Sequence, residues 1–317
     1  MTQNTNLNVS PYFDDFNESK NYNKVLFKPG FPVQARELTT LQSILQNQVE
    51  RFGQHFFKEG SIVIPGSTFY DPSYFSVKID PNFVNIPVRN YTQFLVDNNI
   101  EIQGETSGVR ATVVNRITST ESIDGFDTLY VKYNKSGDDG ETTTFINGEN
   151  LITLSDISFS NTSIEANNQF ARCVVSNATA IGSAFSVSEG VFFVRGYFVR
   201  VPDSTVILDQ YTNTPSYRVG LLLNEEIVTP SNANSDLFDN ARGFSNESAP
   251  GADRFKISTS LSKKSLDDNN DLDFVELFRI ENGIIREQVK TTDYNIFKDE
   301  LARRTYDESG DYYIRPF

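Results

Sequence analysis

The chain has 317 residues, of which 38% are hydrophobic and 22% are charged, a composition typical of a globular protein and too apolar for a disordered one. Its 42 acidic and 28 basic residues give a net charge of -14, which argues against nucleic acid or an anionic membrane surface as the main partner, because both bind clustered positive charge. No stretch of sequence approaches the ~18 apolar residues of a membrane span, so we expect no membrane insertion. The single cysteine permits no internal disulfide, which fits folding in a reducing cytosol.

The first 60 residues are predicted to form a polar arm, residues 1–33, followed by an oligomerisation or docking helix. Pro32 suits the first turn of a helix, and Gly53 is a suitable C-terminal stop. From Thr39 through Val49 the sequence carries no charged residue, whereas a helix at a protein surface normally presents charged side chains to water. The surroundings of this helix are therefore expected to be something other than open solvent.

The apolar residues of this helix are spaced three and four positions apart, which is typical of the a/d seam of a coiled coil. Ile44 and Val49 widen the seam to one side. Two interpretations are open, because two heptads are short for a coiled coil: the seam packs on the chain's own β-domain, or it contacts a second chain. The seam comprises Leu38, Leu41, Leu45 and Phe52, with the polar Gln48 in the remaining position.

The other flank of the same helix is polar but neutral. Such side chains form hydrogen bonds without carrying charge, which suits a crowded protein interface better than open water. We therefore predict that the helix lies between its own domain and a second polypeptide. The neutral flank comprises Thr40, Gln42, Ser43, Gln46 and Asn47.

The remaining sequence predicts an α+β fold that is mainly β, with several small antiparallel modules resembling barrels or sandwiches. Residues 61–99 are predicted as a β-segment of the main domain, in which "IPVRNYTQFLV" is interpreted as strand. Residues 100–157 are predicted as an inserted β-barrel or sandwich module. Residues 158–317 are predicted to form a β-rich domain with a loop-rich segment at 230–254. Within it, "SAFSVSEGVFFVRGYFVRVPDSTVIL" predicts a hairpin or meander of three strands, and the tail predicts a short helix and a last strand.

Residues that could carry catalysis are scarce. His55 is the only histidine and Cys173 the only cysteine, and neither lies in a motif of a nucleophilic enzyme. A zinc site built on histidines would need a second histidine. We interpret both residues as structural and expect no enzyme activity, no cofactor and no metal site.

Carboxylates are plentiful, and three adjacent pairs lie in turn-like segments, where Asp is favoured because it hydrogen-bonds its own backbone. "DDNNDLDFVELF" places Asp or Asn at positions 1, 3, 5 and 7 of a calcium loop, but Leu272 stands where glycine is needed and Phe278 where the bidentate glutamate is needed. A surface loop is therefore predicted. The pairs are Asp14 and Asp15, Asp138 and Asp139, and Asp267 and Asp268.

The segment "SPYFDDFNESKNYNKVLFKPGFPVQARELTTLQSILQNQVERFGQHFFKEGSIV" resembles the N-terminal domain, of unknown function, of large virion structural proteins of tailed phages. Such proteins occur especially in cyanophages and other T-even-type phages, where they are described as baseplate or tail-fibre components. Further segments are similar to the same family, namely "GETSGVRATVV" with "TLYVKY", "EGVFFVRGYFV" with "LFDNARGFSNESAPGADRFKI", and "RRTYDESGDYYIRPF". The resemblance implies a particle-proximal adaptor, and the family supplies no agreed catalytic residues.

Together, the residues and the resemblance predict a structural protein of the phage virion that folds in the host cytoplasm. It is expected to be an oligomeric adaptor in the baseplate or at the tail-fibre attachment point. Its expected partners are other virion tail, baseplate or fibre proteins and copies of itself, with a trimer expected because fibres are usually threefold. The predicted interface residues are Leu38, Leu41, Gln42, Ser43, Leu45, Gln46, Gln48 and Phe52 of the helix and Tyr12, Phe13 and Phe16 of the arm.

Two questions stay open at this stage. The aromatic residues of the arm predict docking on an adjacent subunit, but an arm that folds on its own chain is equally compatible with its sequence. The alternative function is a receptor-binding or glycan-degrading tail module. Such a module would need an exposed aromatic cleft with two carboxylates roughly 5 to 10 Å apart.

Overall fold

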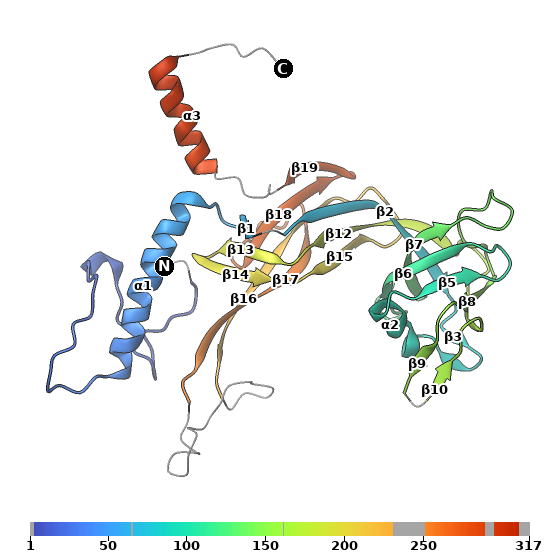
Figure 1. Cartoon of the computed structure of the whole chain (residues 1–317), viewed down its shortest axis with the longest axis horizontal. Coiled ribbons are helices and arrows are strands. Elements are labelled where there is room, and N and C mark those ends of the chain that lie inside the picture. The colour runs from blue at the N-terminus through green and yellow to red at the C-terminus, as the bar shows by residue number, and fades with distance from the viewer. Residues whose placement is uncertain (1–2, 65, 161, 231–250, 289–294, 311–317) are drawn as a thin grey trace, which may run out of the picture.

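A computed structural model describes the protein over residues 3–64, 66–160, 162–230, 251–288 and 295–310 (Figure 1). Within these residues the chain forms three α-helices, one short 3-10 helix and 19 strands, whose pairings are antiparallel. The predicted α+β, mainly β class is confirmed. Among the described residues, no helix has the length and apolar character needed to cross a membrane.

The arm and the first helix form one end of the molecule (Figure 1). The arm contains the 3-10 helix η1 (Glu18–Lys20), and helix α1 spans Ala35–Phe56. The backbone N–H of Gln34 donates to the Glu37 carboxylate at 3.1 Å, which satisfies a free donor at the start of α1. Gly53 lies inside the helix, so the predicted stop at this residue is wrong.

The largest sheet has eight strands in the order β11-β8-β5-β6-β7-β2-β12-β15. Two of its strands, β2 and β12, pair along most of their length and join the two halves of the molecule. The strands are β2 (Thr68–Ile79), β5 (Glu101–Gly104), β6 (Arg110–Ile117), β7 (Asp127–Lys135), β8 (Asn150–Thr153), β11 (Gln169–Arg172), β12 (Thr179–Val187) and β15 (Ser204–Asp209).

One hydrophobic core lies in the module at the end of the molecule opposite α1 (Figure 1). It runs from Val77 to Ala178 and so extends beyond the predicted boundaries 100–157 on both sides. Helix α2 (Arg89–Asp97) contributes to it, and the interpretation of this segment as strand is wrong, because Tyr91 and Leu95 lie one turn apart on a buried helical face. Two small hairpins complete the module: β3 (Asn82–Phe83) with β4 (Ile86–Pro87), and β9 (Ile157–Phe159) with β10 (Thr162–Ile164).

A second core lies between strands β2, β12 and β15 of the large sheet and two smaller sheets. Phe185, Phe192, Leu221 and Phe278 are fully buried in it. The smaller sheets have the orders β1-β13-β14 and β17-β16-β18-β19. Their strands are β1 (Ile62–Ile64), β13 (Gly190–Val194), β14 (Tyr197–Val201), β16 (Tyr217–Val228), β17 (Arg254–Ser265), β18 (Phe274–Glu281) and β19 (Ile284–Gln288).

The segment predicted as a three-stranded hairpin or meander forms four strands. β13 and β14 form a hairpin that turns at Arg195 and Gly196, as predicted, but β12 pairs with β15 outside it. The predicted tail helix is α3 (Asn295–Ser309), which approaches α1 (Figure 1). The predicted last strand and most of the loop-rich segment 230–254 lie outside the described residues.

Candidate interaction surface on helix α1

Helix α1 turns most of its neutral polar flank toward its own chain, whereas Gln42 of the same flank is exposed. Ser43 and Asn47 are buried, and Ser43 Oγ donates a hydrogen bond to the Asp14 carboxylate. Thr40 Oγ1 donates to the same carboxylate at 3.0 Å, and Gln46 Nε2 donates to the Gly196 carbonyl at 2.8 Å. The prediction that a second polypeptide covers this flank is therefore wrong for Ser43 and Asn47, because the arm and the β13–β14 turn already cover them.

Two glycines allow this close packing. A Cβ on Gly53 would lie 2.4 Å from Cε2 of the buried Phe193 ring in β13. A Cβ on Gly196, which has a φ of +80°, would lie 2.5 Å from Cγ of Glu50. Beyond the helix, Phe57 contacts the Phe193 ring at a centroid distance of 5.8 Å. The rotation of α1 about its axis is thus fixed by contacts with the β13–β14 hairpin.

Because the polar flank faces inward, the apolar seam of α1 faces outward. Leu38, Leu45 and Phe52 are 50%, 59% and 66% exposed, and Leu41 is half-buried. This is the reverse of an ordinary surface helix, in which the apolar stripe packs on the protein and the polar face meets water. We call this surface the α1 stripe, and it comprises Leu38, Leu41, Leu45, Gln48, Val49 and Phe52.

An apolar cluster that the sequence interpretation missed lies beside the start of α1. Leu26, Phe27, Phe31 and Val33 are all exposed. They line a hollow of about 340 Å³ that also reaches Glu37 of the helix. The signal was present in "KVLFKPGFPV", where five apolar residues, Val25 among them, flank a Pro-Gly turn. The exposed apolar surface therefore covers the arm's end as well as the helix.

The arm folds on its own chain in this structure. The backbone N–H groups of Asn4 and Thr5 donate to the Glu225 carboxylate of β16 at 3.0 and 2.8 Å. Tyr12 donates its hydroxyl to Asp253 at 2.5 Å, and this hydrogen bond raises the pKa of Tyr12 to about 12. Of the other two arm aromatics in the predicted interface, Phe16 is half-buried and Phe13 is exposed.

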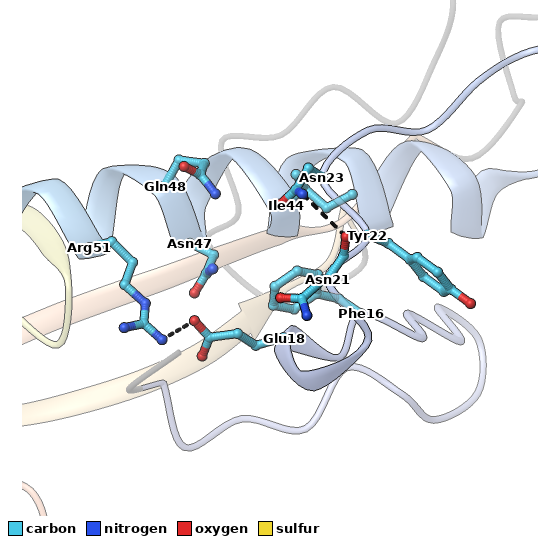
Figure 2. A pocket seen from close by; sticks show the side chains of 9 residues that line it. All are labelled: Phe16, Glu18, Asn21, Tyr22, Asn23, Ile44, Asn47, Gln48 and Arg51. Atoms are coloured by element: carbon cyan, nitrogen blue, oxygen red, sulfur yellow. Dashed lines mark hydrogen bonds and ion pairs between the residues drawn. The ribbon is translucent and has the colours of Figure 1, made fainter.

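A pocket of about 290 Å³ lies between the arm and α1 (Figure 2). At one side Arg51 of the helix forms an ion pair with Glu18 of the arm, and this contact lowers the pKa of Glu18. Asn47 lines the pocket and is buried, and its Oδ1 has no hydrogen-bond partner in the described part of the chain. The pocket is lined by Phe16, Glu18, Asn21, Tyr22, Asn23, Ile44, Asn47, Gln48 and Arg51.

The two residues considered for nucleophilic chemistry, His55 and Cys173, lie in different environments. His55 is exposed in the last turn of α1, with its ring edge-on to Phe56 at a centroid distance of 5.7 Å. Cys173 is buried in the module core, as predicted, and burial raises the pKa of its thiol. A buried thiol with a raised pKa is a poor nucleophile.

The paired carboxylates bind groups of their own chain. Asp139 accepts a hydrogen bond from the Thr142 backbone at 2.9 Å, and Asp268 accepts one from the Asn270 backbone at 2.9 Å, as turn residues do. Asp14 differs from this expectation, because it is buried against α1. Asp271, within the rejected calcium loop, pairs with the buried Arg218 at 2.6 Å. Across the described ranges, no cluster of three or more metal-ligating side chains is present.

Comparison with known proteins places the chain in a family. Residues 10–124 and 146–317 match a family described as a domain of unknown function, DUF4815. The chain belongs to the DUF4815 family. The match to DUF4815 includes α1 and most of the arm, and it omits residues 125–145, which contain β7 of the module. No curated protein and no solved structure matches the chain.

Proposed function

We propose that this DUF4815 chain is a structural protein of a phage virion, an oligomeric adaptor in the tail baseplate or at the tail-fibre attachment point. It works by protein–protein binding, and it needs neither a cofactor nor a catalytic centre for that role. The α1 stripe, together with the apolar cluster at residues 26–33, is the surface that binds its neighbours in the particle.

The outward-facing apolar seam of α1 is the observation that carries this proposal. Fully burying a Leu or Phe side chain contributes ~1.5–3 kcal/mol. Covering the exposed half of Leu38, Leu45 and Phe52 would therefore contribute about 1 kcal/mol or more for each side chain. A partner would not have to displace the contacts of the inward flank, which pack the helix on its own domain.

The resemblance of the arm and helix segment to N-terminal domains of phage virion proteins supplies the assembly in which such a surface would be used. It supports a particle-proximal position for the chain. Within the described residues, no observation favours a glycan-degrading module, since Asp14, Asp139 and Asp271 accept hydrogen bonds or ion pairs from their own chain.

The test is the location of the protein. Mass spectrometry of purified particles, from the phage whose genome encodes the chain, is expected to find it in stoichiometric amounts in the tail fraction. Its confinement to the non-particle fraction of the lysate, or a gene outside any phage genome, would overturn the proposal.

In the same particles, a Leu45→Lys variant is expected to be incorporated at a strongly reduced level, whereas Ile123→Lys, an exposed position on the distant module, is expected to be incorporated normally.

A further inference from the structure

We propose that the partner of the α1 stripe is the α1 stripe of other copies of this chain, joined in parallel and in register as a short coiled coil. The inference rests on the proposed binding role of the stripe and names what it binds. It concerns the isolated chain in solution, so it can fail while incorporation into the particle still holds.

The spacing of the seam specifies the partner. Leu38, Leu45 and Phe52 occupy a positions, and Leu41 and Gln48 occupy d positions of one heptad pattern. Such a seam is complementary to the same seam on a second copy, because the a and d side chains of each helix fit between the side chains of the other. The a and d positions are those that face outward here, with the d-position Leu41 half-buried.

The covered side of α1 is consistent with the same geometry. Ser43 and Glu50 occupy f positions, which point away from the axis of a coiled coil, and both are buried against the arm or the β13–β14 hairpin. Each copy therefore carries its own domain on the outside of the helix. Several copies can approach along their seams without disturbing the contacts that Ser43 and Glu50 make within the chain.

Charge also favours this surface over others for self-association. Each copy carries a net charge of -14, so two copies repel over most approaches. The stretch from Thr39 through Val49 bears no charge, and the next acidic residue, Glu50, points inward. The α1 stripe is therefore a neutral, apolar surface on which two such chains can approach without a local electrostatic cost.

The position of Gln48 decides the orientation. An antiparallel pair that places Leu45 opposite Leu41 brings Glu37 near Arg51 of the other copy, but it also buries the Gln48 amide against Leu38. An unpaired buried amide costs more than an exposed ion pair contributes, and Arg51 already pairs with Glu18. In the parallel, in-register arrangement the Gln48 amides face each other and can hydrogen-bond, while leucines oppose leucines.

Disulfide trapping tests the orientation in the full chain. The only native cysteine in the sequence, Cys173, is buried, so any disulfide-linked dimer is expected to form through the engineered cysteine. Under mild oxidation, Gln48→Cys is expected to form covalent dimers, because equivalent d positions in a parallel coiled coil lie within disulfide reach. Gln42→Cys, at a position that is also exposed, is the control and is expected to remain unlinked. Covalent dimers from Gln42→Cys without dimers from Gln48→Cys would overturn the parallel arrangement.

The molar mass tests the self-association itself. Light scattering of the native chain at concentrations up to about 0.1 mM is expected to give two or more copies, since this range detects even weak association. Leu45→Lys is expected to give the mass of one copy with unchanged circular dichroism, and Ile123→Lys, also exposed, the native mass. A native chain that stays at the mass of one copy would overturn the self-association, and the stripe would then bind a different protein.

Discussion

Gly53 shows how a single residue sets the place of α1. Glycine inside a helix costs about 1 kcal/mol relative to alanine, so its presence in the last third of α1 needs a reason. The reason is the Phe193 ring, whose Cε2 lies 2.4 Å from the position a Cβ would occupy. From the sequence, the same glycine predicted the end of the helix, because the strand that approaches it lies 140 residues further along the chain and leaves no local signal.

Gly53→Ala is accordingly expected to destabilise the fold even though alanine is the better helix former. The gain in helix propensity of about 1 kcal/mol is opposed by overpacking against a buried ring, which typically costs ~1–3 kcal/mol. We expect a net loss of up to about 2 kcal/mol in the free energy of unfolding, measured by urea denaturation. Gln42→Ala, at an exposed position of the same helix, is the control and should change stability little. A Gly53→Ala chain more stable than the native one would contradict the close packing.

At the scale of elements, the sequence predicted α1 better than its surroundings. The three- and four-residue spacing identified the seam residues and the absence of charge identified a flank hidden from water. Which partner hides the flank could not be predicted, because Asp14 and Gly196 reach it through the folding of distant segments. In contrast, α2 was predicted as a strand because Val, Tyr and Phe in "IPVRNYTQFLV" favour strands, and tertiary packing of Tyr91 and Leu95 overrides that preference.

The attachment of the arm to α1 depends on Asp14. Its carboxylate accepts hydrogen bonds from Ser43 Oγ, from Thr40 Oγ1 at 3.0 Å and from the Phe16 backbone at 3.1 Å. Asp14→Ala leaves the buried Ser43 hydroxyl without this acceptor, which costs roughly 1–3 kcal/mol. We expect hydrogen exchange to show loss of amide protection in the arm, while amides of β16 and β18 keep theirs.

Asp15 provides the matched control for this experiment. It is exposed, and in the described part of the chain its carboxylate accepts a longer hydrogen bond, of 3.3 Å, from Thr40 Oγ1. Asp15→Ala should therefore leave the protection of the arm close to native. Equal loss of protection in both variants would mean that the negative charge of this segment, rather than the buried hydrogen bonds of Asp14, holds the arm on the helix.

At the scale of the whole molecule, two cores share one sheet. Strand β2 contributes Val77 and Ile79 to the module core, while Tyr70 of the same strand packs on the second core. The sequence predicted a separate inserted module, and its strands were predictable from their alternation. The continuity of the sheet was not, because 47 residues separate the end of β2 from the start of β7 and 99 separate it from the start of β12.

A polar cluster ties the loop between β6 and β7 to this shared sheet. Lys78 of β2 contacts the Asp124 carboxylate at 2.6 Å, and the Tyr211 hydroxyl donates to the same carboxylate at 2.9 Å. The Lys78 ammonium also lies 3.9 Å from the centroid of the Tyr211 ring. Burial by itself raises the pKa of Asp124, but hydrogen bonds from Lys78, Ser122 and Tyr211 outweigh it and lower that pKa to about 2.

This lowered pKa predicts how stability depends on acid. Because the folded-state pKa lies below the unfolded value of about 3.9, the ionised carboxylate stabilises the fold at neutral pH, and this contribution is lost as the pH falls from about 4 through about 2. Asp124→Asn should lower the free energy of unfolding by about 1–2 kcal/mol at pH 7, after allowance for solvent screening. The difference from the native chain should shrink toward pH 2, as measured by urea denaturation across this range. Asp203 is an exposed carboxylate in the β14–β15 turn, and Asp203→Asn should show no such difference from the native chain. If the difference in stability between Asp124→Asn and the native chain stays constant with pH, the substitution acts through altered packing and not through the lost charge.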